Sequence, residues 1–156
     1  MTIAPASFLV GPLLTLQQHM CYSISIEMRP SRRAAVQPVP ATEGSVVTKA
    51  VLRAAGRLGV SNKALAGIIG LSEASVSRMG SGGFTLTAGD KPFELSVLFL
   101  RLFRSLDALV DGDDAVARAW LRNENAALQG VPLNAIQSIP GLVHAVAYLD
   151  ARRALV

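Results

Sequence analysis

The sequence has few of the residues from which disulfides, metal sites and many active sites are built. It contains 1 Cys and 2 His among 156 residues. The single cysteine, Cys21, excludes a disulfide within the chain. A four-ligand zinc site would need carboxylates in addition to these three side chains. We therefore expect no metal site and a reducing, cytoplasmic location.

Charged residues are also scarce. They make up 17% of the chain, hydrophobic residues make up 51%, and the mean hydropathy is +0.39. This composition excludes a disordered chain, which would be polar and rich in charge. The 13 Gly and 8 Pro are too few for a collagen-like chain. The apolar excess indicates surface that another protein covers.

The basic residues are unevenly distributed along the chain, whose net charge is +4. Residues 1–60 carry six Lys/Arg and two acidic residues, residues 61–105 carry five and three, and residues 106–156 carry four and six. The basic excess in the first two thirds suits a nucleic-acid partner, and the net negative last third suggests a second task.

The first 44 residues begin with an apolar stretch and end in residues 29–44, which contain three Pro and three Arg and have no apolar period. Residues 3–16 are mostly apolar, but they are too few to span a bilayer, which needs about 20 residues. They also lack the preceding basic residues of a signal peptide. We expect no membrane segment but a poorly ordered leader, with Met20 or Met28 as the true start. A linker or basic arm follows over residues 29–44.

From Ser45 onward the apolar spacing is helical, and no segment alternates convincingly as a strand does. Ser45 is expected to cap a first helix that ends before Gly59, Ser61 a second helix, Ser72 a third, and Asp113 or Asp114 a later one. The expected helices cover residues 45–58, 62–69, 73–79, 92–110, 114–122 and 140–154, with short helical pieces around 125–128 and 132–137. The predicted fold class is all-α, a helix-turn-helix bundle followed by a small helical domain. Its parts are residues 45–90, 91–112 and 113–156.

Residues 62–79 have the spacing of a helix-turn-helix. Ala66 is small where two helices would cross, Gly70 lets the chain turn, and Val76 would fill the joint. The second helix of such a unit enters the major groove by its N-terminal end. The candidate DNA-binding residues are Ser61, Lys63, Ser72, Glu73, Ser75, Ser77 and Arg78. The alternative is a pair of packed helices that bind no DNA.

The expected recognition helix carries a single positive charge, so one copy should bind DNA weakly. This implies a dimer. The helix over residues 92–110 is apolar nearly all round, which is typical of a helix covered on more than one side. Its candidate dimerisation residues are Phe93, Val97, Leu100 and Phe103. The alternative is that this helix lies at the centre of one monomeric core.

The second half carries four distinctive motifs: ARAWL at 117–121, NENAALQGVP at 123–132, SIPG at 138–141 and VAYLDARR at 146–153. With these motifs after such a helix-turn-helix, the chain from about Ser45 to Val156 resembles antitoxins of the Xre/MbcA/ParS class. The resemblance implies a non-enzymatic antitoxin that is encoded with its toxin and represses its own operon. It also implies an all-α toxin-binding domain at the C-terminus. The implied partner is an NAD-depleting RES-domain toxin whose active site the antitoxin covers, in a homodimer or a larger complex with the toxin.

The same resemblance implies a set of toxin-binding residues near the C-terminus. These are Asn125, Tyr148, Arg152, Arg153 and the terminal carboxylate of Val156. Each has a structural alternative: two arginines at the end of a helix also suit the helix dipole without any partner. Trp120, the only tryptophan, is expected in the core.

No set of residues typical of an enzyme is evident. The sequence has no H-E-x-x-H, no G-x-S-x-G and no Gly-rich phosphate loop after a strand. We expect no catalytic residue and no cofactor. Two other functions stay open at this point: a stand-alone helix-turn-helix repressor, and an interaction subunit that does not bind DNA.

Overall fold

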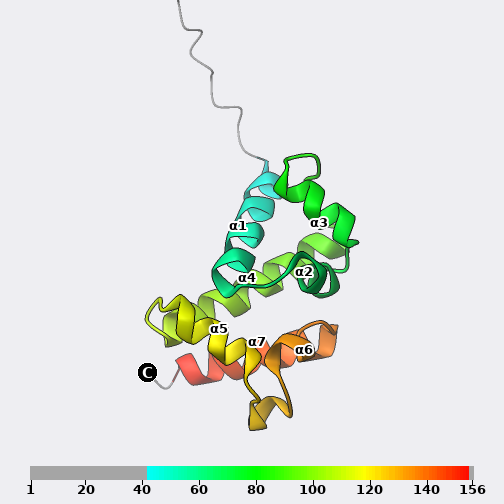
Figure 1. The fold of residues 1–156 in the computed structure, drawn as a ribbon. Helices are drawn as coiled ribbons and strands as arrows, with labels where there is room; N and C mark the ends of the chain where they lie inside the picture. The colour runs from blue at the N-terminus through cyan, green and yellow to red at the C-terminus, as the bar shows by residue number, and fades with distance from the viewer. Residues whose placement is uncertain (1–41, 155–156) are drawn as a thin grey trace, which may run out of the picture. The chain divides into compact units, whose positions relative to one another are not determined.

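A computed structural model describes residues 42–154, and this part of the chain is all-α, as predicted (Figure 1). Its helices are α1 Glu43–Leu58, α2 Asn62–Ile69, α3 Glu73–Gly80, α4 Lys91–Leu109, α5 Asp114–Arg122, α6 Pro132–Ala135 and α7 Ile139–Arg153, with a 3₁₀ turn, η1, at Ala126–Leu128. Within these residues the β-type pairing is a single bridge between Asn125 and Gly130. The predictions for the leader, the linker up to residue 41 and Val156 lie outside the described residues.

The ends of the first helices follow the expected capping, with one correction. The Ser61 hydroxyl accepts a hydrogen bond from the Ala64 amide at 3.2 Å, and Gly59 ends α1 in the left-handed conformation with φ of 65°. The predicted cap at Ser45 is wrong. Thr42 caps α1 instead, and the Ser45 hydroxyl donates to the Thr42 carbonyl at 2.8 Å from inside the first turn.

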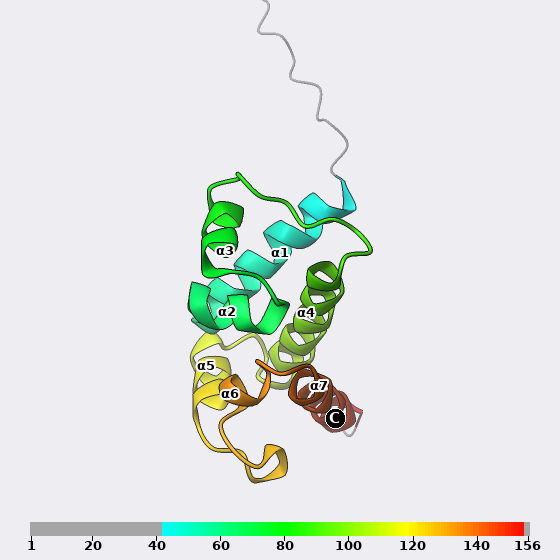
Figure 2. The ribbon, with the colours of Figure 1, turned by 90° about the vertical axis from the view of Figure 1, so that its right-hand side faces the viewer.

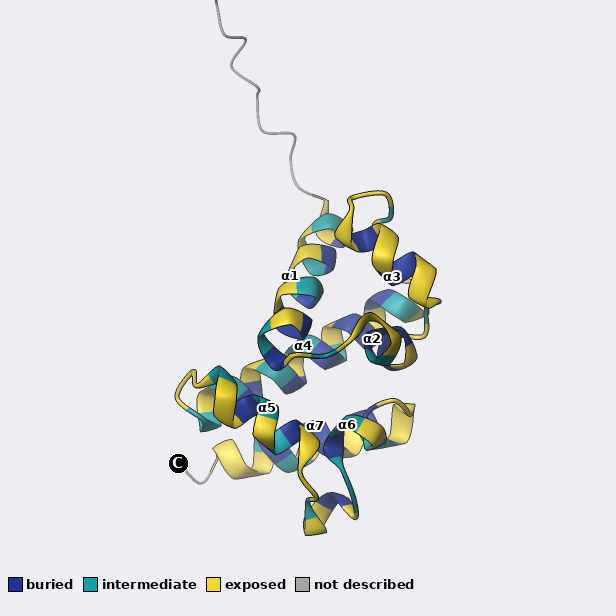
Figure 3. Cartoon of the chain, in the orientation of Figure 1, coloured by how far each residue is buried: buried dark blue, intermediate teal, exposed yellow. Residues whose placement is uncertain are grey.

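Helix α4 lies at the centre of the hydrophobic core. It contacts α1 and α2 on one side and α7 on the other, and both views show this arrangement (Figures 1 and 2). Phe99 and Leu102 of α4 are completely buried, and Ser96 beside them is buried too. Figure 3 shows the buried residues of all the long helices turned toward this centre.

The start of α1 is anchored to the segment that precedes α4. The Thr48 hydroxyl donates to the Gly44 carbonyl at 2.7 Å and accepts from the Leu86 amide at 3.0 Å. Gly44 lies so close to the Leu86 carbonyl that a side chain at position 44 would collide with it. The sequence predicts a linker at Gly44, because a contact between residues 42 apart in the chain has no local signal.

A second close approach explains the SIPG motif at the start of α7. Ser138 caps this helix by accepting from the Gly141 amide at 3.2 Å, and its hydroxyl donates to the Ala135 carbonyl at 3.1 Å. Gly141 lies against the same Ala135 carbonyl, where a Cβ would clash. Pro140 occupies the first turn, where its missing N–H costs no hydrogen bond.

None of the helices in residues 42–154 has both the length and the apolar character needed to cross a membrane.

The close approach at Gly44 makes a matched pair of predictions within α1. Gly44→Ala should lower the free energy of unfolding by about 1–3 kcal/mol, because the added methyl group forces the Leu86 backbone to move. Gly56→Ala, in the same helix with open space around it, should be neutral or stabilising by up to about 1 kcal/mol. Urea unfolding measures both. Equal effects of the two substitutions would contradict the close packing at Gly44.

Candidate functional site

The helix-turn-helix forms as its spacing predicts. Ala66 and Val76 are buried between α2 and α3. Gly70 turns the chain in the left-handed conformation, with φ of 72°, and the Leu71 amide donates to the Ala66 carbonyl at 3.0 Å. The packing of α2 against α3 therefore depends on the small side chain of Ala66, the turn at Gly70 and the buried side chain of Val76.

Six of the seven candidate DNA-binding residues are exposed, and Ser75 is not. A residue that contacts DNA must face outward, but Ser75 keeps only 9% of its surface accessible, so its choice as a candidate is wrong. It shares the buried face of α3 with Val76 and Met79, and its hydroxyl forms hydrogen bonds with the hydroxyl of Ser72 at 2.9 Å and the guanidinium of Arg78 at 3.2 Å. Ser75 thus orients Arg78 rather than pointing into solvent.

The remaining candidates differ in whether their side chains already form hydrogen bonds within the protein. Ser61 and Ser72 cap α2 and α3, so their oxygens accept backbone N–H groups at the two helix starts. Lys63 and Ser77 are exposed and make no side-chain hydrogen bond within residues 42–154. The basic and hydroxyl groups available on this surface are therefore those of Lys63, Ser77 and Arg78.

The candidate dimerisation residues lie largely inside the single chain. Phe93 is only 8% exposed and belongs to the core of its own chain, so its choice as a dimerisation residue is wrong. Leu100 and Phe103 are half-buried and pack against the same core, and Val97 is 45% exposed. The alternative of a central core helix therefore describes most of this face, since α1, α2 and α7 cover it.

Arg57 joins the end of α1 to the second half of the chain. Its guanidinium pairs with Asp107 at 2.8 Å and with Asp114 at 2.8 Å, and it lies 5.0 Å from the centre of the Phe103 ring. The hydrogen bond to Asp114 is the largest cause of the raised pKa of Arg57. The spacing of Asp114 and Arg118, four residues apart on one helix, favours an ion pair between them. In the structure Asp114 pairs with Arg57 instead, and the Arg118 guanidinium donates to the Arg57 carbonyl at 2.6 Å.

The candidate toxin-binding residues fall on separate surfaces. The Asn125 side chain caps η1 by accepting from the amides of Ala127 and Leu128, so it shapes its own loop. Arg152 lies over the ring of half-buried Tyr148, 5.4 Å from its centre. Arg153 lines a pocket instead, which shows that neighbouring arginines at the end of α7 face different surroundings. Trp120 is half-buried and packs against the core, as expected.

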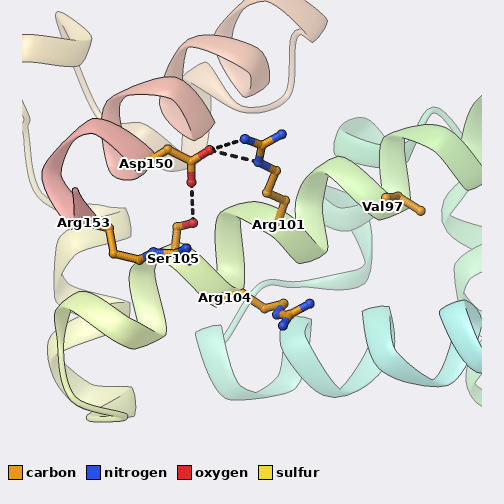
Figure 4. A pocket seen from close by; sticks show the side chains of 6 residues that line it. All are labelled: Val97, Arg101, Arg104, Ser105, Asp150 and Arg153. Atoms are coloured by element: carbon orange, nitrogen blue, oxygen red, sulfur yellow. Dashed lines mark hydrogen bonds and ion pairs between the residues drawn. The ribbon is translucent and has the colours of Figure 1, made fainter.

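The pocket that contains Arg153 lies between α4 and α7, as Figure 4 shows. Its volume is about 580 Å³, and it is lined by Val97, Arg101, Arg104, Ser105, Asp150 and Arg153. Asp150 accepts from the Arg101 guanidinium at 2.9 and 2.6 Å and from the Ser105 hydroxyl at 2.6 Å. The Ser105 bond is the largest cause of the lowered pKa of Asp150, and Arg101 lowers it further.

The sequence alone does not predict this pocket. The spacing of 97, 101 and 104 along one helix, and of 150 and 153 along another, places each set on a common face. Nothing in the sequence indicates that these two faces meet, because α4 and α7 are separated by some 30 residues of loops and short helices.

The geometry defines a helical protein with a helix-turn-helix and a second, basic surface on α4 and α7. Residues 37–101 match the antitoxin Xre-like helix-turn-helix domain, and residues 105–154 match the antitoxin Xre/MbcA/ParS C-terminal toxin-binding domain. No curated protein matches the chain. Because the two matches together cover most of its length, the chain belongs to the Xre/MbcA/ParS-type antitoxins.

The hydrogen bond between Ser105 and Asp150 predicts a specific response to pH. Because the folded-state pKa of Asp150 is lowered, the ionised carboxylate stabilises the fold above the unfolded-state pKa of about 3.9, and this stabilisation is lost as the pH falls through the folded-state value. Ser105→Ala should raise the pKa of Asp150 and should destabilise the protein more at neutral pH than in acid. An NMR titration of the Asp150 carboxyl carbon measures the change in pKa, and urea unfolding at neutral pH and in acid measures the change in stability.

Ser45→Ala serves as the control, because the Ser45 hydroxyl bonds to the Thr42 carbonyl at the start of α1. Its titration of Asp150 should match that of the unmodified protein. An unchanged Asp150 pKa in Ser105→Ala would contradict the assigned cause.

Proposed function

We propose that this antitoxin neutralises an NAD-depleting RES-domain toxin by covering its active site, and that it represses its own operon through α2 and α3. The observation that carries the proposal is the presence of an antitoxin helix-turn-helix and a toxin-binding domain on one continuous hydrophobic core. The protein acts by binding in the cytoplasm and performs no catalysis itself.

The DNA-binding half of the proposal is supported by the exposed surface of α2 and α3. Lys63 and Arg78 supply positive charge, and Ser77 supplies a hydroxyl that can donate to phosphates or base edges. The N-terminal ends of both helices also favour phosphate oxygens. Since α3 carries few positive charges, we propose that two copies bind a two-part operator, alone or in a larger complex with the toxin.

The toxin-binding half of the proposal is supported by the C-terminal helix. Arg152 over Tyr148 forms a basic and aromatic surface, and such residues are enriched at the energetically dominant positions of protein interfaces. Asn125 contributes by fixing the loop around η1. We propose that this surface and the end of the chain, including Val156, approach the toxin active site.

Co-expression tests neutralisation directly. Growth should stop and cellular NAD should fall when the reading frame adjacent to this gene is expressed alone, and both should recover when this chain is co-expressed. Arg152→Glu reverses an exposed charge on the surface proposed to meet the toxin, and this variant should rescue growth less well than the unmodified chain. Failure of the full chain to rescue, with DNA binding retained, would leave a stand-alone repressor and overturn the proposal.

A gel shift on the DNA upstream of the gene tests repression. The double variant Lys63→Ala/Arg78→Ala should bind at least about tenfold more weakly and with a smaller salt dependence, because it loses two phosphate or base contacts. Lys91→Ala, which removes one charge at the exposed start of α4, should bind like the unmodified protein. Absence of any shift, with the toxin present as well as absent, would contradict the repressor role.

A further inference from the structure

The pocket between α4 and α7 has more positive charge than its own acidic residue neutralises. It is lined by three arginines and one aspartate. Asp150 pairs directly with Arg101 and attracts Arg153 at longer range, whereas neither Arg104 nor Arg153 forms a direct ion pair within residues 42–154. Two guanidinium groups at the pocket are therefore left to interact with a negatively charged partner (Figure 4).

The remaining contacts hold the pocket in a defined shape. Ser105 is buried in α4 and donates to one carboxylate oxygen of Asp150, while Arg101 donates twice to the other. Asp150 is thus held from two sides, and it in turn fixes the Arg101 guanidinium. Arg104 and Arg153 stay available beside this network, and a guanidinium binds a carboxylate through two parallel hydrogen bonds.

The exposure of the pocket favours a protein as its occupant over a small anion. The Arg101 side chain is 64% exposed, so the pocket is open to solvent on one side. Sites for small molecules enclose roughly 70–90% of the ligand surface. Val97, also exposed, lies at one end of the pocket and provides apolar contact beside the charges. Charged groups next to apolar surface, with arginine prominent, are typical of protein interfaces.

The family matches point to the toxin as the protein that occupies this pocket. Ser105, Asp150 and Arg153 belong to the segment that matches the toxin-binding domain, and Arg101 and Arg104 lie within the preceding turn of α4. We propose that the pocket between α4 and α7 accepts an acidic side chain of the toxin, with Arg104 and Arg153 as its direct partners and Arg101 oriented by Asp150. This inference rests on the proposed function.

The contact is distinct from the Tyr148 surface described above. Arg152 lies over Tyr148, whereas Arg153 turns into the pocket with the arginines of α4. Toxin contacts at both places would extend the interface from the end of α7 to the outer face of α4.

Charge reversal tests the proposal. Arg104→Glu/Arg153→Glu leaves Arg101, Ser105 and Asp150 in the chain, and it should weaken binding to the purified product of the adjacent reading frame at least about tenfold. Arg104→Gln/Arg153→Gln removes the two positive charges without placing a new carboxylate beside Asp150, and it should weaken binding in the same direction. The matched control is Lys49→Glu/Arg53→Glu, which reverses two exposed charges on α1 and should bind normally. Circular dichroism and thermal unfolding check that both variants fold. Arg104→Gln/Arg153→Gln replaces the reversal variant if that variant is unfolded.

Each outcome separates the pocket from the proposed function. If the unmodified chain binds and neutralises its partner and the arginine variants bind equally well, the pocket proposal is overturned and the antitoxin role stands. If the unmodified chain binds no partner, both are overturned. Inorganic phosphate is tested as a competing ligand. If phosphate raises the melting temperature of the unmodified chain but not of the arginine variants, and all of these proteins bind the partner equally well, the pocket is a small-anion site and the proposal fails. Loss of binding in the arginine variants, with its recovery when a toxin Asp or Glu is changed to Lys in the charge-reversed pair, supports it.

Discussion

The need to cover α4 on two sides is the constraint on which the rest of the structure depends. Its apolar residues cover all of the helix except an exposed stripe that contains Glu94, Arg101 and Arg104, so a partner on one side would leave apolar side chains on the other side in water. Helices α1 and α2 cover one side and α7 covers the other, with Phe99 and Leu102 completely buried between them. The helix-turn-helix and the toxin-binding domain consequently share one core, and neither can form its full hydrophobic contacts without α4.

A polar junction complements this shared core at the end of α1. Arg57 reaches both Asp107 at the end of α4 and Asp114 at the start of α5, and Arg118 and Arg122 of α5 return hydrogen bonds to the backbone carbonyls of Arg57 and Gly59. Surface ion pairs contribute little individually. Their value here is geometric, because they fix how α5 leaves α4 and hence where the segment from α5 to α7 begins.

The sequence could predict the features that depend on local chemistry. Ser61, Gly59 and Gly70 mark helix ends by their own backbone preferences, and the Ala66, Gly70 and Val76 spacing predicts a turn between two helices. It could not predict features that arise when distant segments meet. Gly44 is glycine because of Leu86, Ser75 is buried because of how α3 docks, and Phe93 serves the core of its own chain. The pocket of Arg101, Arg104 and Arg153 belongs to this second group.

The position of that pocket connects the two tasks of the chain. Arg101 ends the segment that matches the helix-turn-helix domain, Arg153 lies in the segment that matches the toxin-binding domain, and Asp150 links them through its bonds to Arg101 and Ser105. The pocket therefore exists only while α7 is docked on α4. Any partner that binds it stabilises this docking, because ligands that bind only the folded arrangement shift the equilibrium toward it. Since α4 also supports α1 and α2, occupation of the pocket stabilises the core from which the helix-turn-helix projects.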